Sequence, residues 1–318
     1  MLRNMFRAAG AIFLISSFSS VQAAVAQQPA APQAAVPGSA ADLVQQGQKL
    51  SHEGRQDDAI TLYERALAKT PDFYEAHLSE GVAFDLKGDY AHAQEHFTKA
   101  IEVAPADSKQ QALRAMAVSY DFAGDMFKAA QSELQVFNAR LAKSDLVGAA
   151  EICNELARMY LESGDADHAY KWYGMGYQTI SHKEDLTDAD KNLWLFRWES
   201  AQARVAARRS QADEARQHVM AAKVALDKAN DPEQARFYPY LTGYVAFYTG
   251  DYKTAIVELQ KADQRDPLIL ALLGEAYEKS GDGVQAKGYY HKVLEANVHN
   301  STSAFGRPLA QKKLAGGA

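Results

Sequence analysis

A recurring spacing of glycine and alanine is the feature of this sequence that most constrains its fold. In six places an alanine follows a glycine by five residues, and in five of these places the glycine is followed directly by aspartate. The glycines are Gly54, Gly88, Gly124, Gly164, Gly250 and Gly281, and the alanines are Ala59, Ala93, Ala129, Ala169, Ala255 and Ala286. A sequence that repeats at a period of tens of residues predicts stacked copies of one small structural unit.

The chemistry of these positions predicts a pair of helices joined by a tight turn. A glycine just beyond a helix adopts the left-handed conformation that closes the helix. The aspartate caps the next helix by accepting a backbone N–H, and the small alanine lets the two helices approach closely. Large apolar residues three and four apart would fill one face of each helix. Pro71, Pro105 and Pro267 each follow an anchor glycine by seventeen residues and would stop the second helix.

This pattern resembles the tetratricopeptide repeat family, whose unit is 34 residues folded as two antiparallel helices. The first two anchor glycines are 34 residues apart. The family's signature positions in these two units hold Gly47, Gly54, Ala59, Tyr63, Ala66 and Pro71, then Gly81, Gly88, Ala93, Phe97, Ala100 and Pro105. The resemblance implies an all-α, right-handed superhelical solenoid of about seven helix pairs over residues 40–300, followed by a capping helix and tail at residues 301–318.

Two stretches depart from the family pattern. The third unit has Glu133 and Val136 where a large and a small apolar residue are usual. Further along, 86 residues separate two successive anchor glycines, which leaves room for one degenerate unit at residues 186–230 plus an insertion before it. Thr187 and Asp190 form a capping-box sequence, so the first helix of that unit is predicted to begin there.

The N-terminal residues are typical of a secretory signal peptide, predicted over residues 1–26. Arg3 and Arg7 precede a short apolar run, and small residues follow at a spacing that favours cleavage. Residues 27–39 are rich in Ala, Pro and Gln and predict a flexible linker. We therefore expect export, most simply to the periplasm of a bacterium. The alternative is an uncleaved signal that holds the chain near a membrane.

Several function classes are disfavoured by composition and motifs. The net charge of −6 argues against a nucleic-acid partner, and the single cysteine, Cys153, cannot form an intramolecular disulfide. His92, Glu95 and His96 match the H-x-x-E-H pattern of a family of zinc proteases, so a zinc metallohydrolase is one alternative. The repeat register places these histidines on the outer side of a helix, and no third protein ligand is identifiable. We expect no metal, no cofactor and no catalytic residue.

In the family that this chain resembles, the first helix of each pair lines a concave groove that receives ligands. The groove positions of the sixth unit are all aromatic, and the fifth unit places three arginines on one helix face. Together they would receive an extended segment that carries an acid and an apolar anchor. The alternatives are rings that pack against neighbouring helices and a solvated charged face. The predicted ligand-binding residues are Arg197, Arg204, Arg208, Phe237, Tyr240, Tyr244, Phe247 and Tyr248.

These expectations favour a protein that works by protein–protein interaction. The sequence predicts an exported, non-enzymatic scaffold, adaptor or assembly factor that binds an extended peptide segment in its groove. Stacked tyrosine rings would also suit sugars, so a module that binds cell-wall glycan is a second alternative beside the zinc enzyme. Self-association through the C-terminal units is also open. The sequence identifies neither the partner nor whether the aromatic face is open or covered.

Overall fold

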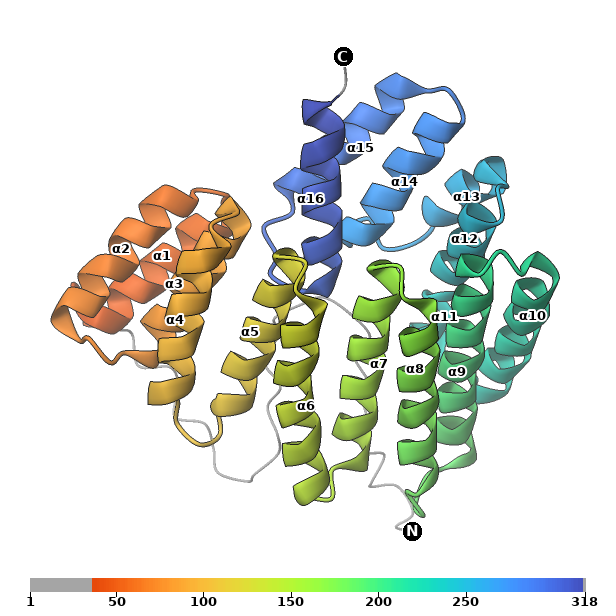
Figure 1. The fold of residues 1–318 in the computed structure, drawn as a ribbon, viewed down its shortest axis with the longest axis horizontal. Coiled ribbons are helices and arrows are strands. Elements are labelled where there is room, and N and C mark those ends of the chain that lie inside the picture. Colours follow the sequence, from red (N-terminus) through yellow and green to blue (C-terminus); the bar gives the residue numbers. More distant parts are fainter. Residues whose placement is uncertain (1–35, 317–318) are drawn as a thin grey trace, which may run out of the picture.

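The computed structural model describes residues 36–316, which form sixteen helices and no strand (Figure 1). In this view the array runs from α1 at the left to α10 at the right and then turns back, so that α16 lies near its centre. The helices are α1 (Ala40–His52), α2 (Gln56–Lys69), α3 (Tyr74–Lys87), α4 (Tyr90–Val103), α5 (Lys109–Phe122), α6 (Met126–Ala142), α7 (Leu146–Glu162), α8 (Ala166–Ser181), α9 (Asp188–Arg208), α10 (Ala212–Ala229), α11 (Pro232–Ala235), α12 (Tyr238–Tyr248), α13 (Tyr252–Leu259), α14 (Pro267–Lys279), α15 (Gly283–Glu295) and α16 (Ser301–Ala315).

Consecutive helices pack in pairs, as the repeat pattern predicted. The pairs are α1 with α2, α3 with α4, α5 with α6, α7 with α8, α9 with α10, α12 with α13, and α14 with α15. A single helix, α16, follows the last pair. The predicted fold class, an all-α solenoid of about seven pairs and a C-terminal helix, is confirmed.

The second pair shows why the repeated residues produce this geometry. Gly88 takes a φ of 90° at the turn between α3 and α4, a left-handed conformation that glycine adopts without strain. Asp89 then caps α4 by accepting the backbone N–H of His92. Within the pair, a Cβ atom added at Gly81 would lie 2.7 Å from the Phe97 ring. The two helices therefore touch at a point where only a glycine fits.

The degenerate fifth unit keeps the pair without the anchor glycine. The predicted capping box is present, because the Thr187 hydroxyl accepts the Asp190 N–H and the Asp190 carboxylate accepts the Thr187 N–H, each at 3.1 Å. Ser210 occupies the turn between α9 and α10 with a φ of 61°. A serine thus adopts the left-handed backbone that glycine supplies elsewhere, which explains why the glycine pattern missed this turn.

The C-terminal segment does more than cover the last pair. Besides packing on α14 and α15, α16 packs on α5, which is distant in sequence. His299 Nε2 lies 2.7 Å from the Asp85 carboxylate, and Arg307 donates hydrogen bonds to the carbonyl oxygens of Leu86 and Leu294. The segment therefore joins the second and third units to the end of the array. A repeat pattern reports contacts between successive units, so it could not predict this connection.

Two of the sequence predictions fall largely outside the described residues. The predicted signal peptide at residues 1–26 lies outside them entirely, as does most of the predicted linker at residues 27–39. Between residues 36 and 316, no helix has both the length and the apolar character needed to cross a membrane.

Candidate functional site

The predicted arginines and tyrosines come together where α9 packs on α12. Arg204 and Arg208 are four residues apart and so share one face of α9, while Tyr244 and Tyr248 share one face of α12 in the same way. The Arg208 guanidinium lies 4.6 Å from the centre of the Tyr248 ring. Its Nη1 atom donates to the hydroxyls of Tyr248 at 3.1 Å and Tyr244 at 3.3 Å. Two helices of neighbouring units are thereby linked by one arginine.

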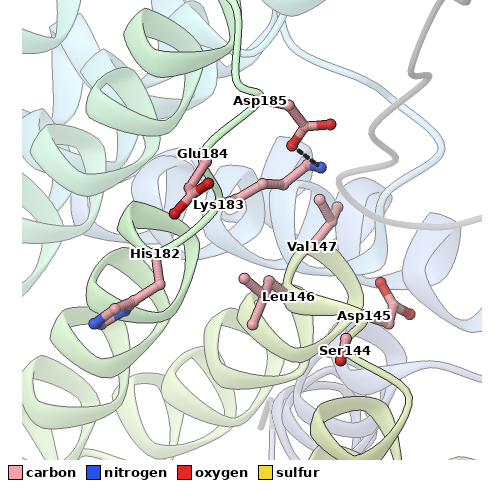
Figure 2. Close-up of a pocket in the computed structure, with 8 residues that line it drawn as sticks. All are labelled: Ser144, Asp145, Leu146, Val147, His182, Lys183, Glu184 and Asp185. Carbon is pink, nitrogen blue, oxygen red and sulfur yellow. Dashed lines mark hydrogen bonds and ion pairs between the residues drawn. The ribbon is translucent and has the colours of Figure 1, made fainter.

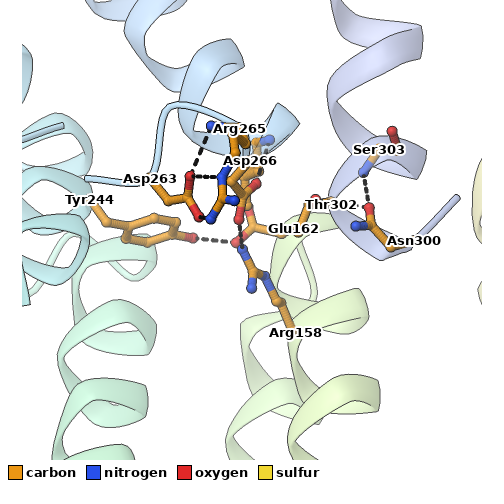
Figure 3. A network of polar contacts seen from close by, with 10 residues as sticks. Arg158, Glu162, Tyr244, Asp263, Arg265, Asp266, Asn300, Thr302 and Ser303 are labelled. Atoms are coloured by element: carbon orange, nitrogen blue, oxygen red, sulfur yellow. Dashed lines mark hydrogen bonds and ion pairs between the residues drawn. The ribbon is translucent and has the colours of Figure 1, made fainter. Parts of the chain in front are cut away.

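A glutamate of α7 completes this arrangement. Glu162 accepts hydrogen bonds from the Tyr244 hydroxyl at 3.1 Å (Figure 3) and from Arg208 Nη1 at 3.2 Å. Its side chain is only 3% exposed, so the carboxylate depends on Arg208 for its countercharge. Burial and the nearby Glu162 carboxylate together hold the pKa of Tyr244 well above its usual range, so the hydroxyl keeps its proton and donates. These residues and their neighbours form what we call the Arg–Tyr cluster, which consists of Arg158, Glu162, Tyr173, Arg204, Arg208, Tyr240, Tyr244, Tyr248 and Asp266.

Arg158 of α7 belongs to this cluster although it was not among the predicted ligand-binding residues. Its guanidinium lies 5.6 Å from the Tyr240 ring centre and 3.7 Å from a carboxylate oxygen of Asp266, which caps α14 (Figure 3). Burial raises the pKa of Tyr240 to about 12. Arg158 occupies a groove position of the fourth unit, just as Arg204 occupies one of the fifth unit. The repeat pattern could therefore have identified Arg158 as a candidate binding residue.

Three of the predicted residues lie outside the Arg–Tyr cluster. Arg197 stacks on Trp194, with its guanidinium 4.5 Å from the ring, and desolvation by burial lowers its pKa to about 10. Phe237 precedes α12 and lies 4.9 Å from the Arg236 guanidinium. Phe247 meets the Tyr248 ring edge to face at 4.9 Å. The predicted residues therefore divide between a polar cluster and separate stacking contacts.

The five aromatic rings do not form one open face. Tyr244 is 0% exposed, and Tyr240 and Phe247 are 8% and 9% exposed, because α9, α10, α13 and α14 pack around α12. Tyr248 and Phe237 are partly exposed. Most of the aromatic surface thus contributes to the core, which answers the question that the sequence left open. The ligand-binding roles of these residues stay a prediction, and the part of the cluster that borders solvent is Arg204, Arg208 and Tyr248.

A family model matches one of the helix pairs. The tetratricopeptide repeat model matches residues 74–107, which contain α3, α4 and the turn at Gly88. Residues 74–107 thus match a single tetratricopeptide repeat, and the other helix pairs have the same architecture. Proteins built from such repeats are generally non-enzymatic adaptors, and their fold suggests a scaffold for protein–protein interaction.

The chain is similar to several individual proteins. It is 25% identical over 269 residues to Superkiller complex protein 3 of Mus musculus, and the match covers 83% of this chain but only 16% of that relative. The crystal structure of the apo form of RapI superimposes with a TM-score of 0.51 at 13% identity, over 81% of this chain and 97% of RapI. A tetratricopeptide repeat protein from Parabacteroides merdae gives a TM-score of 0.49 at 14% identity, over 86% and 98% of the two chains.

The predicted zinc alternative gains no support from the geometry of these histidines. His92 pairs with Asp89 at 2.7 Å, whereas His96 contacts His77 at 3.2 Å and Glu80 at 3.5 Å. Desolvation by burial lowers the pKa of His96 to about 4. Within the described part of the chain, no group of three or more His, Cys, Asp or Glu side chains is arranged to hold a metal ion.

A shallow depression lies between the turn before α7 and the loop before α9 (Figure 2). It has a volume of about 340 Å³, and its lining shares no residue with the Arg–Tyr cluster. The lining residues are Ser144, Asp145, Leu146, Val147, His182, Lys183, Glu184 and Asp185. Most of them are polar or charged loop residues, without the apolar lining typical of a small-molecule site.

Proposed function

We propose that this protein is an exported, non-enzymatic adaptor that binds an extended segment of a partner protein. The observation that carries the proposal is the Arg–Tyr cluster, most of whose residues lie on α7, α9 and α12, the first helices of three successive pairs. Arg204, Arg208 and Tyr248 remain partly exposed there. Guanidinium groups and tyrosine rings are enriched at the energetically important positions of protein interfaces.

We place the contact surface at the sixth unit, because groove residues of the second and third units are covered by another part of the chain. Asp85, Leu86 and Phe122 are at groove positions of the earlier units, and the C-terminal segment contacts all three through His299 and Arg307. A partner would have to displace that segment to reach them. At α9 and α12, by contrast, Arg204, Arg208 and Tyr248 are partly exposed to solvent.

Site-specific crosslinking in the native compartment tests the adaptor function. A photoreactive phenylalanine analogue at position 248 should yield a discrete adduct with one partner protein. The matched control is the same analogue at Met220 of α10, which is 61% exposed and lies on a second helix. Adducts that are identical from both positions, or none from position 248, would rule out this surface as the contact.

Export is tested separately. Cell fractionation should recover the chain from the periplasm, with an N-terminus generated after Ala23 or Ala26 as determined by Edman sequencing. Deletion of residues 2–26 should retain the chain in the cytoplasm. An unchanged location after the deletion would contradict export through this segment.

A further inference from the structure

Arg158 is buried with its hydrogen-bonding capacity unused. Its side chain is 7% exposed, and none of its three guanidinium nitrogens has a hydrogen-bond partner within residues 36–316. The ion-pair distance of 3.7 Å from Nη2 to Asp266 Oδ2 is too long for a hydrogen bond. Unpaired N–H groups of a buried charge destabilise the folded chain, so an additional acceptor at this position would be favourable.

Further unpaired donors lie around the same point. Tyr240 and Tyr173 are 8% and 4% exposed, and neither hydroxyl has a hydrogen-bond partner among the described residues. The Arg204 guanidinium lies 5.9 Å from the Tyr240 ring and 5.3 Å from the Tyr173 ring, while Arg158 lies 5.6 Å from the Tyr240 ring. Two guanidinium groups, from α7 and α9, thus lie against the rings of two buried tyrosines, from α8 and α12.

The charges of the Arg–Tyr cluster are unequal. It contains three arginines but two carboxylates, Glu162 and Asp266. Glu162 is occupied by Arg208 and the Tyr244 hydroxyl, and Asp266 Oδ1 accepts the backbone N–H of Leu268. Since Asp266 is also the ion-pair partner of Arg158, the positive charge in excess is that of Arg204, which has no ion pair among residues 36–316. One additional carboxylate would balance it, and the two oxygens of a carboxylate match the paired N–H groups of a guanidinium.

We propose that Arg158, Arg204, Tyr173 and Tyr240 form a binding site for a carboxylate. The ligand would enter past the partly exposed Arg204 and Arg208. This inference rests on the proposed function where the carboxylate belongs to an acidic residue of the partner segment. A small free carboxylic acid has the same chemistry, and the experiment below separates the two sources.

The first arm of the test uses the full chain and an array of short random-sequence peptides. The peptides come in pairs that differ only by Glu or Gln at one central position. The Glu member of each bound pair should bind about tenfold more tightly, because the acceptor is charged. Arg158→Gln and Arg204→Gln should each abolish this preference. Arg265→Gln should keep it, since the Arg265 side chain is 82% exposed and pairs with Asp263 outside the cluster.

The second arm titrates the protein with acetate and with succinate while the side-chain Nε–H resonances of arginine are followed by NMR. The resonance of Arg158 should shift on addition of either acid and should not respond to chloride at equal ionic strength. Its assignment comes from its disappearance in Arg158→Gln. Far-UV circular dichroism checks that each variant is folded, and Arg204→Gln carries the test if Arg158→Gln does not fold.

The outcomes separate this inference from the proposed function. Peptides that bind without a preference for Glu would overturn the carboxylate site and leave the adaptor function standing. Arg158 shifts with acetate or succinate in the absence of any peptide binding would support the site, assign it to a free acid and contradict the peptide-binding function. If neither peptides nor free acids bind, both proposals fail.

Discussion

At the scale of single residues, the Glu162 carboxylate links three helices. It belongs to α7 and receives hydrogen bonds from Arg208 of α9 and Tyr244 of α12. Burying the two charges is costly, and the ion pair with its additional hydrogen bonds offsets that cost. Loss of one charge alone should therefore destabilise the protein more than loss of an exposed ion pair.

Glu162→Gln should lower the free energy of unfolding by about 2 kcal/mol, since Arg208 would keep a buried charge without its countercharge. Urea denaturation followed by circular dichroism measures the change. Asp167→Asn is the matched control, because Asp167 pairs with Arg209, the residue that follows Arg208, but the Asp167 side chain is 77% exposed. The control should change stability by about 0.5 kcal/mol or less. Equal losses in the two variants would show that burial does not strengthen the Glu162 interaction.

A second residue-scale prediction concerns Glu133 of α6, where the sequence departs from the repeat pattern. Glu133 is 0% exposed, and neither carboxylate oxygen has a hydrogen-bond partner among residues 36–316. Burial, assisted by the negative charge of Glu155, holds the pKa of Glu133 well above its usual range, while Arg114 opposes the shift. The folded chain thus binds this proton more tightly than the unfolded chain does.

The sign of the resulting pH dependence follows from linkage. The stabilising contribution of protonated Glu133 is fully present below the pKa of about 4.3 in the unfolded chain, and it is lost as the pH rises through the raised pKa of the folded chain. Glu133→Gln cannot ionise, so the variant should match the wild type near pH 4 and exceed its stability increasingly up to pH 8. Urea denaturation at several pH values measures this difference. An exposed control, Glu95→Gln, should show no such trend.

The candidate site was only partly predictable from its residues. The spacing of four put Tyr240, Tyr244 and Tyr248 on one helix face, and the structure keeps them together. Their burial depends on α9, α10 and α14, whose approach the pattern of one unit cannot report. Tyr173 and Asp266 were not predicted as site residues. The groove positions were taken only from first helices, whereas Tyr173 lies on a second helix and Asp266 is a helix cap.

At the scale of elements, each helix pair depends on a small residue facing a large one. A Cβ atom at Gly47 would lie 2.4 Å from Tyr63, and one at Gly274 would lie 2.4 Å from Tyr290. These distances repeat the Gly81–Phe97 contact in other pairs. The repeated glycines inside the first helices are therefore explained by close packing, and the glycines at the turns by the left-handed backbone.

Gly81→Ala should lower the free energy of unfolding by about 1–3 kcal/mol, because the new methyl group must displace the Phe97 ring. Thermal and urea unfolding measure the loss. Gly283→Ala is the control, since Gly283 begins α15 and a Cβ atom there would have no neighbour within 4 Å. Because alanine favours helix more than glycine does, the control should be neutral or slightly stabilising. A neutral Gly81→Ala would contradict the close packing of α3 on α4.

The elements that were predicted least well are short or irregular. The four-residue α11 was not predicted, although Asp231 caps it and Pro232 occupies its first turn, which is a recognisable start signal. A helix of this length contains too little periodicity to register in a repeat pattern. The α9–α10 turn lacks the anchor glycine, because Ser210 replaces it, although the degenerate unit around this turn was predicted.

At the scale of the whole molecule, α16 alters how the array holds together. In a simple solenoid each unit contacts only its neighbours, so units can unfold separately. Here His299 and Arg307 contact Asp85 and Leu86, more than two hundred residues earlier in the chain. Asp85 is buried and is bonded by both His299 and Ser119. The array therefore contains a contact that should make the unfolding of its C-terminal end cooperative with that of the second and third units.

The double variant His299→Ala and Arg307→Ala tests that cooperativity. Hydrogen exchange at the C-terminal end of α3, around Leu86, should become about tenfold faster or more, because Asp85 loses a buried partner and the Leu86 carbonyl loses its donor. Lys312→Ala, an exposed change in the same helix, should leave exchange in α3 unaltered. Faster exchange confined to α14, α15 and α16 would show that the C-terminal segment stabilises only its own end. Faster exchange that extends to α3 and α5 would instead mean that α16 couples the C-terminal end of the solenoid to the second and third units, which nearest-neighbour packing alone cannot do.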